Sequence, residues 1–197
     1  MTVTSGTPFK SAVIWLALGV ALSAPLIAAA QSPLLAWRDP IYIAAGFAGI
    51  MAMGALLLQP LLATGKLPGV SLWQGRHVHR WVGAGLIVMV VAHVIGLWIT
   101  SPPDVIDALL FRSPTPFSVW GVIAMWAIFG SGVLALMRRR LRLRVWRFAH
   151  RALATVVVTG TVLHVIQIEG TMEDITKIAL CALLCGATLW VWTAPRA

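Results

Sequence analysis

Six long apolar stretches are the feature that most constrains how this chain of 197 residues can fold. Each is close to the ~20 apolar residues that a helix needs to cross the hydrocarbon core of a bilayer. A backbone in lipid must pair its polar groups within the segment, and nothing here alternates as barrel strands do, so helices are expected. The predicted spans are Val13–Ala30, Ile41–Ala63, His79–Ile99, Phe117–Met137, His150–Ile168 and Ile175–Val191. The sequence therefore predicts an all-α integral membrane protein, a six-transmembrane-helix bundle that forms one domain over residues 1–197.

The composition agrees with a membrane protein. Hydrophobic residues make up 59% of the chain and charged residues 11%, against about 25% charged in ordinary soluble domains. This excludes a water-soluble globule, and the hydrophobicity excludes a disordered chain. A net charge of +9 would suggest a nucleic-acid partner on a soluble protein. The positions of the basic residues give a different explanation, and no nucleic-acid partner is expected.

The basic residues gather in the segments that lie on one side of a six-span protein. Twelve of the 15 are there: Lys10, Lys66, Arg76, Arg80, Arg138, Arg139, Arg140, Arg142, Arg144, Arg147, Arg151 and Arg196. The other side holds three, and it holds every acidic residue. The positive-inside rule then predicts that both termini are cytoplasmic, in a multi-pass protein of the bacterial inner membrane. One alternative concerns the first span, where Ala28-Ala29-Ala30-Gln31 resembles a signal-peptide cleavage site, and cleavage would leave five spans.

Four of the five histidines form a repeated pattern. The motif R-x-x-H-R-x12-H-V-I occurs twice, at Arg76 to Ile95 and at Arg147 to Ile166. It places the histidines in two pairs of equal spacing, His79 with His93 and His150 with His164. Fourteen helical steps return a side chain to within about 40° of its first direction, about 21 Å further along the axis. Because the third and fifth spans run in the same direction, His79 is expected to face His150 at one depth and His93 to face His164 at another.

Two facing imidazoles at one depth suit a haem iron ligated from both sides, in a bundle core where such cofactors are held. A six-coordinate iron has no open position and favours electron transfer. Guanidinium groups match carboxylates, so Arg76, Arg80, Arg147 and Arg151 are candidates to bind the propionates of the inner haem. Gly83 and Gly160 lie four residues from predicted ligands and either clear room for a porphyrin or allow close helix packing.

Histidines inside a membrane also have roles that involve no haem. They pair with backbone carbonyls or line a proton path. A proton relay more naturally uses Asp or Glu, and no acidic residue lies within a predicted span. His77 is outside the pattern and is interpreted as an interfacial residue. The acidic segment from Glu169 to Asp174 either attracts a cationic or metal-bearing acceptor or is only a solvated surface.

At these residues the sequence resembles the ferric-reductase-like transmembrane domain family. The resemblance covers about Trp73 to Trp192 and is strongest around His79-Arg80 with His93, and Trp146 to Arg151 with His164. The family includes the membrane parts of NADPH oxidases and ferric reductases, and the haem subunit that serves a periplasmic methionine-sulfoxide reductase. The resemblance implies two b-type haems, an inner one on His79 and His150 and an outer one on His93 and His164.

The resemblance also implies an oxidoreductase component that transfers electrons across the membrane. Many relatives continue into a flavin and nicotinamide domain, whereas this sequence ends at Ala197 and has no dinucleotide-binding fingerprint. We therefore expect a separate donor on the cytoplasmic side, either a flavin reductase or quinol, so that a partner supplies the flavin or quinone. The expected acceptor on the outer face is ferric iron, oxygen or a periplasmic redox protein.

Two rival functions follow from the same residues. The first is the haem-binding membrane subunit of a larger quinol-dependent oxidoreductase, such as a methionine-sulfoxide reductase system. In that system the membrane subunit need not keep all four ligand positions, and this chain has all four, which leaves the periplasmic partner open. The second rival is a haem-free transporter or assembly subunit.

Overall fold

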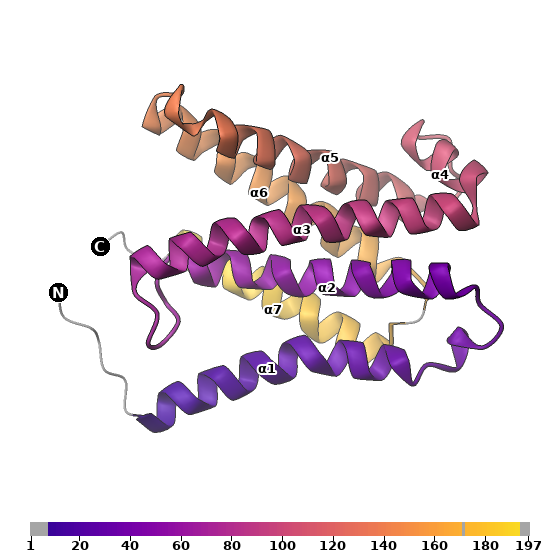
Figure 1. Ribbon diagram of the computed structural model, residues 1–197, viewed down its shortest axis with the longest axis horizontal. Coiled ribbons are helices and arrows are strands. Elements are labelled where there is room, and N and C mark those ends of the chain that lie inside the picture. Colours follow the sequence, from indigo (N-terminus) through magenta and orange to yellow (C-terminus); the bar gives the residue numbers. More distant parts are fainter. Residues whose placement is uncertain (1–7, 171, 194–197) are drawn as a thin grey trace. The chain divides into compact units, whose positions relative to one another are not determined.

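The computed structural model describes residues 8–170 and 172–193, and all regular structure in them is helical. The helices are α1 (Pro8–Ala30), α2 (Pro40–Ala63), α3 (Leu72–Thr100), α4 (Pro102–Leu109), α5 (Pro116–Leu136), α6 (Leu143–Ile166) and α7 (Asp174–Thr193) (Figure 1). Two short 3-10 helices, Pro33–Leu35 and Met137–Arg139, lie in the connections. Within these ranges, six helices are long and apolar enough to cross a membrane. The all-α, six-span prediction is confirmed. Arg196, used to predict orientation, lies outside the described residues.

Local sequence explains where the helices start and where the chain turns between them. Four of them, α1, α2, α4 and α5, begin at a proline, whose fixed φ suits the first helical position and whose missing N–H is not needed there. The connection between α2 and α3 turns at Gly65 and Gly69, with φ of 64° and 76°, a region that glycine enters without steric cost.

The helices differ from the predicted spans in two respects. Both α3 and α6 begin seven residues before the predicted starts at His79 and His150. The apolar window marks only the lipid-crossing part, whereas the helix continues through residues such as Trp, Arg and His that suit the headgroup region. The short helix α4 was not predicted. It begins at two prolines and carries Asp104 in its first turn, where a carboxylate favours the positive end of the helix dipole.

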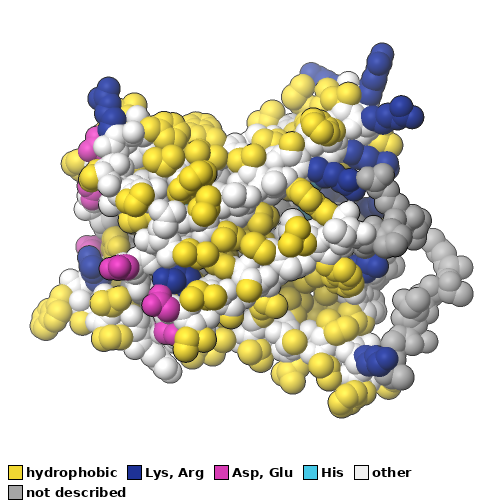
Figure 2. Space-filling model, turned by 180° about the vertical axis from the view of Figure 1, so that it is seen from behind, with side chains coloured by type: hydrophobic (Ala, Val, Ile, Leu, Met, Phe, Trp, Pro, Cys, Tyr) yellow, Lys and Arg dark blue, Asp and Glu magenta, His cyan; other side chains and the backbone are white. Residues whose placement is uncertain are grey.

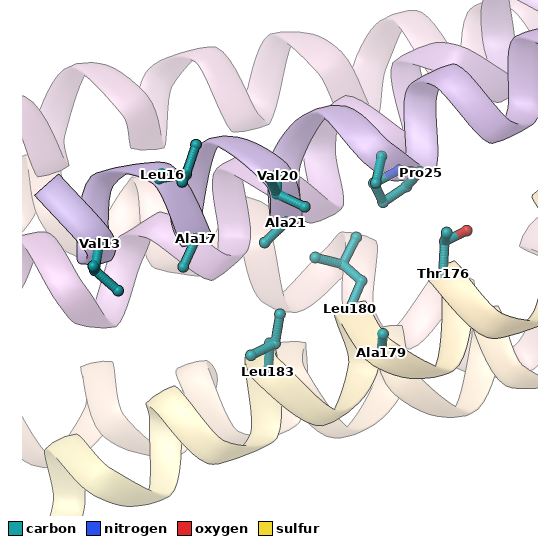
Figure 3. Close-up of a pocket in the computed structure, with 11 residues that line it drawn as sticks. Val13, Leu16, Ala17, Val20, Ala21, Pro25, Thr176, Ala179, Leu180 and Leu183 are labelled. Atoms are coloured by element: carbon teal, nitrogen blue, oxygen red, sulfur yellow. The ribbon is translucent and has the colours of Figure 1, made fainter.

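The chain forms two compact units, and the first contains the described residues of 1–36, 50–86 and 171–197. Here α1 packs on α7, and Leu184 of α7 is fully buried. Between α1 and α7 lies an apolar groove of about 460 Å³ whose single polar side chain is Thr176 (Figure 3). Its walls suit hydrocarbon, because they offer almost no hydrogen-bonding group.

The second unit contains residues 37–49 and 87–170, and its centre is the antiparallel pair of α5 and α6 (Figure 1). Glycine allows the helices to approach closely there. A Cβ on Gly160 of α6 would lie 3.0 Å from the Trp120 carbonyl and 3.1 Å from the Ala124 Cβ. Such small-residue contacts are the usual means of helix association in lipid, where no hydrophobic force drives helices together.

Hydrophobic side chains cover much of the face shown in Figure 2. Among the hydrophobic residues of the described chain, Leu136, Phe148 and Ile175 are 87%, 77% and 77% exposed. A soluble protein rarely exposes apolar surface on this scale. The surface is therefore that of a multi-pass integral membrane protein in contact with lipid.

Candidate functional site

Three of the four predicted ligand histidines make the same kind of contact with the main chain. In each, the ring Nδ1 lies within hydrogen-bond distance of a carbonyl oxygen on the membrane helix that precedes it in the sequence. The three pairs are His79 with Gln59 at 3.1 Å, His93 with Ala45 at 2.8 Å, and His164 with Phe117 at 2.9 Å.

These contacts determine where each neutral imidazole carries its proton. A carbonyl oxygen only accepts hydrogen bonds, so Nδ1 must donate and Nε2 must keep its lone pair. An Nδ1–H bonded to a backbone carbonyl is also the usual support of a histidine that binds metal through Nε2. The three rings are therefore oriented and protonated as ligands through Nε2 require.

Glycine gives two of the rings the space to reach their carbonyls. Gly49 lies four residues after Ala45, and Gly121 lies four residues after Phe117. A Cβ on Gly49 would be 3.1 Å from the His93 Nδ1. Each ring therefore packs against a helix surface one turn beyond the carbonyl that it contacts.

The fit is tighter at Gly121. A Cβ there would be 2.7 Å from the His164 Nδ1 and 2.8 Å from its Cε1. Both distances are shorter than real Cβ atoms show, so a larger residue would displace the ring. Phe117 also presents its ring edge-on to His164, with 5.8 Å between ring centroids.

His93 and His164 belong to the same compact unit and are close enough to interact electrostatically. The structure thus brings together one predicted pair, from α3 and α6. His150 also belongs to this unit, whereas His79 belongs to the first unit.

His150 is oriented by an aromatic neighbour one turn earlier on α6. Its ring stacks on Trp146 with 5.2 Å between centroids and an interplanar angle of 5°. Trp146 is itself fixed, because its Nε1 donates to the Leu134 carbonyl at 3.1 Å and the Arg138 guanidinium lies 4.9 Å from its ring centroid. The connection from α5 to α6 therefore supports this histidine through Trp146.

The predicted histidine ligands suit a haem iron better than a metal ion that is held by protein side chains alone. Among the described residues, no three His, Cys, Asp or Glu side chains gather as ligands for a metal ion. A porphyrin would supply most of the ligands of a haem iron, so that histidines of the protein could complete the set. His79, His93 and His164, each with Nδ1 against a carbonyl oxygen, present Nε2 as the ligand atom.

The four arginines proposed to bind propionates are exposed: Arg76, Arg80, Arg147 and Arg151. Arg80 turns toward His77, where its Nη2 lies 3.1 Å from Nδ1. His77 is exposed, stacks on Trp73 at 5.8 Å, and accepts a hydrogen bond at Nε2 from Trp81 at 3.2 Å. These contacts agree with the interpretation of His77 as an interfacial residue.

The two glycines predicted to clear space have different surroundings. Gly160 packs against α5, which favours close helix packing, the alternative that the sequence leaves open. A Cβ on Gly83 would approach only the side-chain amide of Gln59 within 4 Å, at 3.7 Å from Nε2. Gly83 therefore has room that Gly160 lacks.

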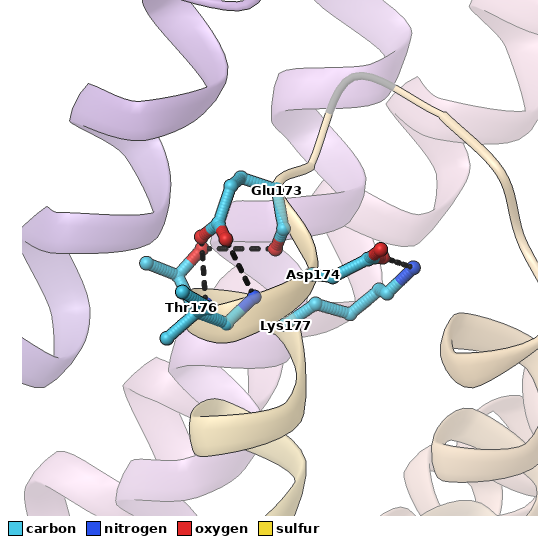
Figure 4. Close-up of polar contacts among 5 residues, drawn as sticks. Glu173, Asp174, Thr176 and Lys177 are labelled. Atoms are coloured by element: carbon cyan, nitrogen blue, oxygen red, sulfur yellow. Dashed lines mark hydrogen bonds and ion pairs between the residues drawn. The ribbon is translucent and has the colours of Figure 1, made fainter.

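The acidic segment before α7 has local structural contacts. Glu173 accepts hydrogen bonds from the backbone N–H groups of Ile175 and Thr176, at 2.7 and 2.9 Å (Figure 4). These bonds, the Thr176 one first, hold the pKa of the Glu173 carboxyl below its usual value. Asp174 pairs with Lys177 at 2.6 Å. Two of the acidic groups thus stabilise the start of α7, which favours a structural explanation over acceptor binding.

Sequence reasoning missed the groups that hold the imidazole rings in place: Gln59, Ala45 and Phe117 with their carbonyls, and the glycines Gly49 and Gly121. A carbonyl has no residue-type preference, so nothing in the sequence marks its position. The spacing of a glycine four residues later was visible, but glycine is common in membrane helices for packing reasons alone.

The comparisons with known proteins give a family match. The model of the family described as ferric reductase like transmembrane component matches residues 45–161, more than half of the chain. The matched range contains His79, His93 and His150 and ends three residues before His164. No curated protein and no solved structure matches the chain.

Proposed function

Because this chain belongs to the family of ferric reductase like transmembrane components, we propose that it transfers electrons across the membrane through two bis-histidine b-type haems. Membrane redox electron transfer is the general activity of this family, and its domains generally bind haem. In the proposal, His79 and His150 ligate an inner haem, and His93 and His164 ligate an outer one. A bound b-type haem supplies a one-electron carrier that cycles between ferric and ferrous iron.

One observation supports the proposal above the others, namely the matched hydrogen bonds from Nδ1 of His79, His93 and His164 to main-chain carbonyls. A proton relay needs a ring that can release and recapture protons at both nitrogens. These rings instead hold Nδ1–H against a carbonyl, which leaves only Nε2 for chemistry. That arrangement suits a ligand and not a relay.

The proposed orientation of the protein in the membrane follows from the positions of the basic residues. Both termini are cytoplasmic by the positive-inside rule, in a bacterial inner membrane. The donor is then a separate flavin reductase or quinol on the inner side, with the inner propionates bound by Arg76, Arg80, Arg147 and Arg151. The acceptor on the outer side is ferric iron, oxygen or a periplasmic redox protein.

Alanine variants of the four histidines test the proposal in purified full-length protein. Reduced-minus-oxidised spectra and pyridine haemochrome assays should give two protohaems per chain with low-spin bis-imidazole spectra. His79→Ala and His150→Ala should lose one haem, and His93→Ala and His164→Ala the other. If His79→Ala and His93→Ala instead removed the same haem, the facing-helix arrangement would be wrong. A chain without any Soret band would favour a haem-free transporter or assembly subunit.

A further inference from the structure

We propose that the side-chain amide of Gln59 is a hydrogen-bond donor to a propionate of the haem that His79 ligates. This inference rests on the proposed function and deepens it, because it names a carboxylate-binding group on α2 that the sequence does not indicate. The inference rests on Gln59 and Gly83, which lie beside His79 in the first compact unit.

Gln59 contacts the proposed ligand with its main chain. Its carbonyl oxygen accepts the hydrogen bond from the His79 Nδ1 at 3.1 Å. The α-carbon of Gln59 is therefore fixed close to the imidazole, and its side chain starts from that point.

The side-chain Nε2 of Gln59 is buried and has no hydrogen-bond partner among the described residues. The atom is inaccessible to solvent. A buried N–H donor without a partner is destabilising, so native proteins rarely keep one without a ligand or water. This unpaired donor indicates an acceptor that completes the site.

The space beside the amide belongs to the proposed haem site. Gly83 lies one turn after His79 on α3, and its missing Cβ would be 3.7 Å from the Gln59 Nε2 and 3.8 Å from its Oε1. The amide therefore lies along the α3 backbone beyond His79, against a residue that has no side chain. Gly83 thus sets the amide one helical turn from His79, at ordinary van der Waals distance from the position of the missing Cβ on α3.

A carboxylate is the acceptor that this place favours. Gln59 lies four residues before the end of α2 at Ala63, which is about 6 Å along the axis. Arg80, the arginine next to His79, instead lies against His77. An amide N–H to a carboxylate is a charge-assisted bond and is stronger than a neutral one.

The test compares haem with its dimethyl ester, in which both propionates are methylated and uncharged. Apoprotein of the full chain in nanodiscs is titrated with each, and the haem that His79→Ala abolishes is followed by its Soret band. The wild type should prefer the free acid. Gln59→Leu should weaken binding of the free acid about 10-fold or more and change ester binding little, so that the preference falls.

Two further variants complete the design. Gln59→Glu places a carboxylate against the propionate and should weaken free-acid binding more than Gln59→Leu does, with partial recovery as the pH is lowered. Gln167→Leu is the matched control, because the Gln167 Nε2 already donates to the Leu163 carbonyl at 2.7 Å. It should leave the preference unchanged.

The outcomes distinguish a failure of the proposed role of Gln59 from a failure of the proposed function. If His79→Ala removes a haem but Gln59→Leu and Gln59→Glu keep the wild-type preference for the free acid, the role of Gln59 is wrong and the proposed function stands. If Gln59→Leu weakens acid and ester binding equally, the amide acts only in packing, which also overturns the inference. If His79→Ala loses no haem, both proposals fail.

Discussion

Replacing Gly121 with alanine should disturb one predicted haem ligand without removing it. The added Cβ would lie 2.7 Å from the His164 Nδ1 and 3.2 Å from its Cγ, whereas non-bonded heavy atoms prefer about 3.5–4.0 Å. The imidazole must therefore move by about 1 Å. Its hydrogen bond to the Phe117 carbonyl would lengthen from 2.9 Å to nearly 4 Å, which exceeds the useful range.

Two opposing energies decide what the change does. Alanine improves helix propensity over glycine by about 1 kcal/mol, while a buried polar group that loses its partner costs about 1–3 kcal/mol. The net cost to the stability of the fold should therefore be about 0–2 kcal/mol. Haem binding should change more, since loss of a support for a metal-binding histidine typically costs about 10–100-fold in affinity.

The assay is haem titration with optical and EPR spectra of purified Gly121→Ala. We expect weaker binding of the haem that His164→Ala abolishes, and a changed low-spin signal, with the other haem unaffected. Gly130→Ala is the matched control on the same helix, because its Cβ would meet Leu153 at an ordinary 3.6 Å. Equal haem affinity and spectra for Gly121→Ala and Gly130→Ala would refute the reasoning.

A graded comparison strengthens this test. Gly49→Ala places its Cβ 3.1 Å from the His93 Nδ1, so the His93 ring must move by only a few tenths of an ångström. Its effect should be in the same direction as that of Gly121→Ala but smaller. An effect of Gly49→Ala larger than that of Gly121→Ala would contradict a steric cause.

Three other predictions follow from single contacts. Trp146→Ala should broaden or shift the spectrum of the haem that His150→Ala abolishes, because His150 loses its stacked support; an unchanged spectrum would contradict this. The Glu173 carboxyl should titrate below its ordinary value of 4.5 in an NMR titration. Because this pKa is lowered in the folded state, the bonds to the start of α7 persist above the ordinary value and are lost as the pH falls through the lowered one; a midpoint at or above 4.5 would count against them. Gly75→Ala should destabilise the protein by about 1–3 kcal/mol in thermal unfolding, since its Cβ would lie 2.5 Å from the Leu62 carbonyl, and wild-type stability would argue against that close contact.

Much of the fold was predictable from the sequence because lipid limits the choices. The apolar stretches must be helices, and their lengths fix six spans, as α1 to α3 and α5 to α7 confirm. The true starts of α3 and α6 were not predictable from apolar length, since helices continue beyond the hydrocarbon region. The short α4 was also missed, because eight residues between prolines contain no long periodic pattern.

The candidate site, like the fold, was predictable from the sequence only in part. The repeated spacing at His79, His93, His150 and His164 was visible, because helical periodicity turns sequence distance into direction and depth. Their roles as ligands stay a prediction. The structure added the carbonyls of Gln59 and its counterparts, which have no sequence pattern.

By itself, the sequence determined the membrane class, the number of spans and the two histidine pairs, because these depend on hydrophobicity and helical repeat along one chain. Only the tertiary structure decided which nitrogen of His79, His93 and His164 carries the proton, and which glycines give those rings room. Both depend on the helix packed against each histidine. A backbone carbonyl or a missing Cβ acts through its position in space, and that position exists only once the helices have packed.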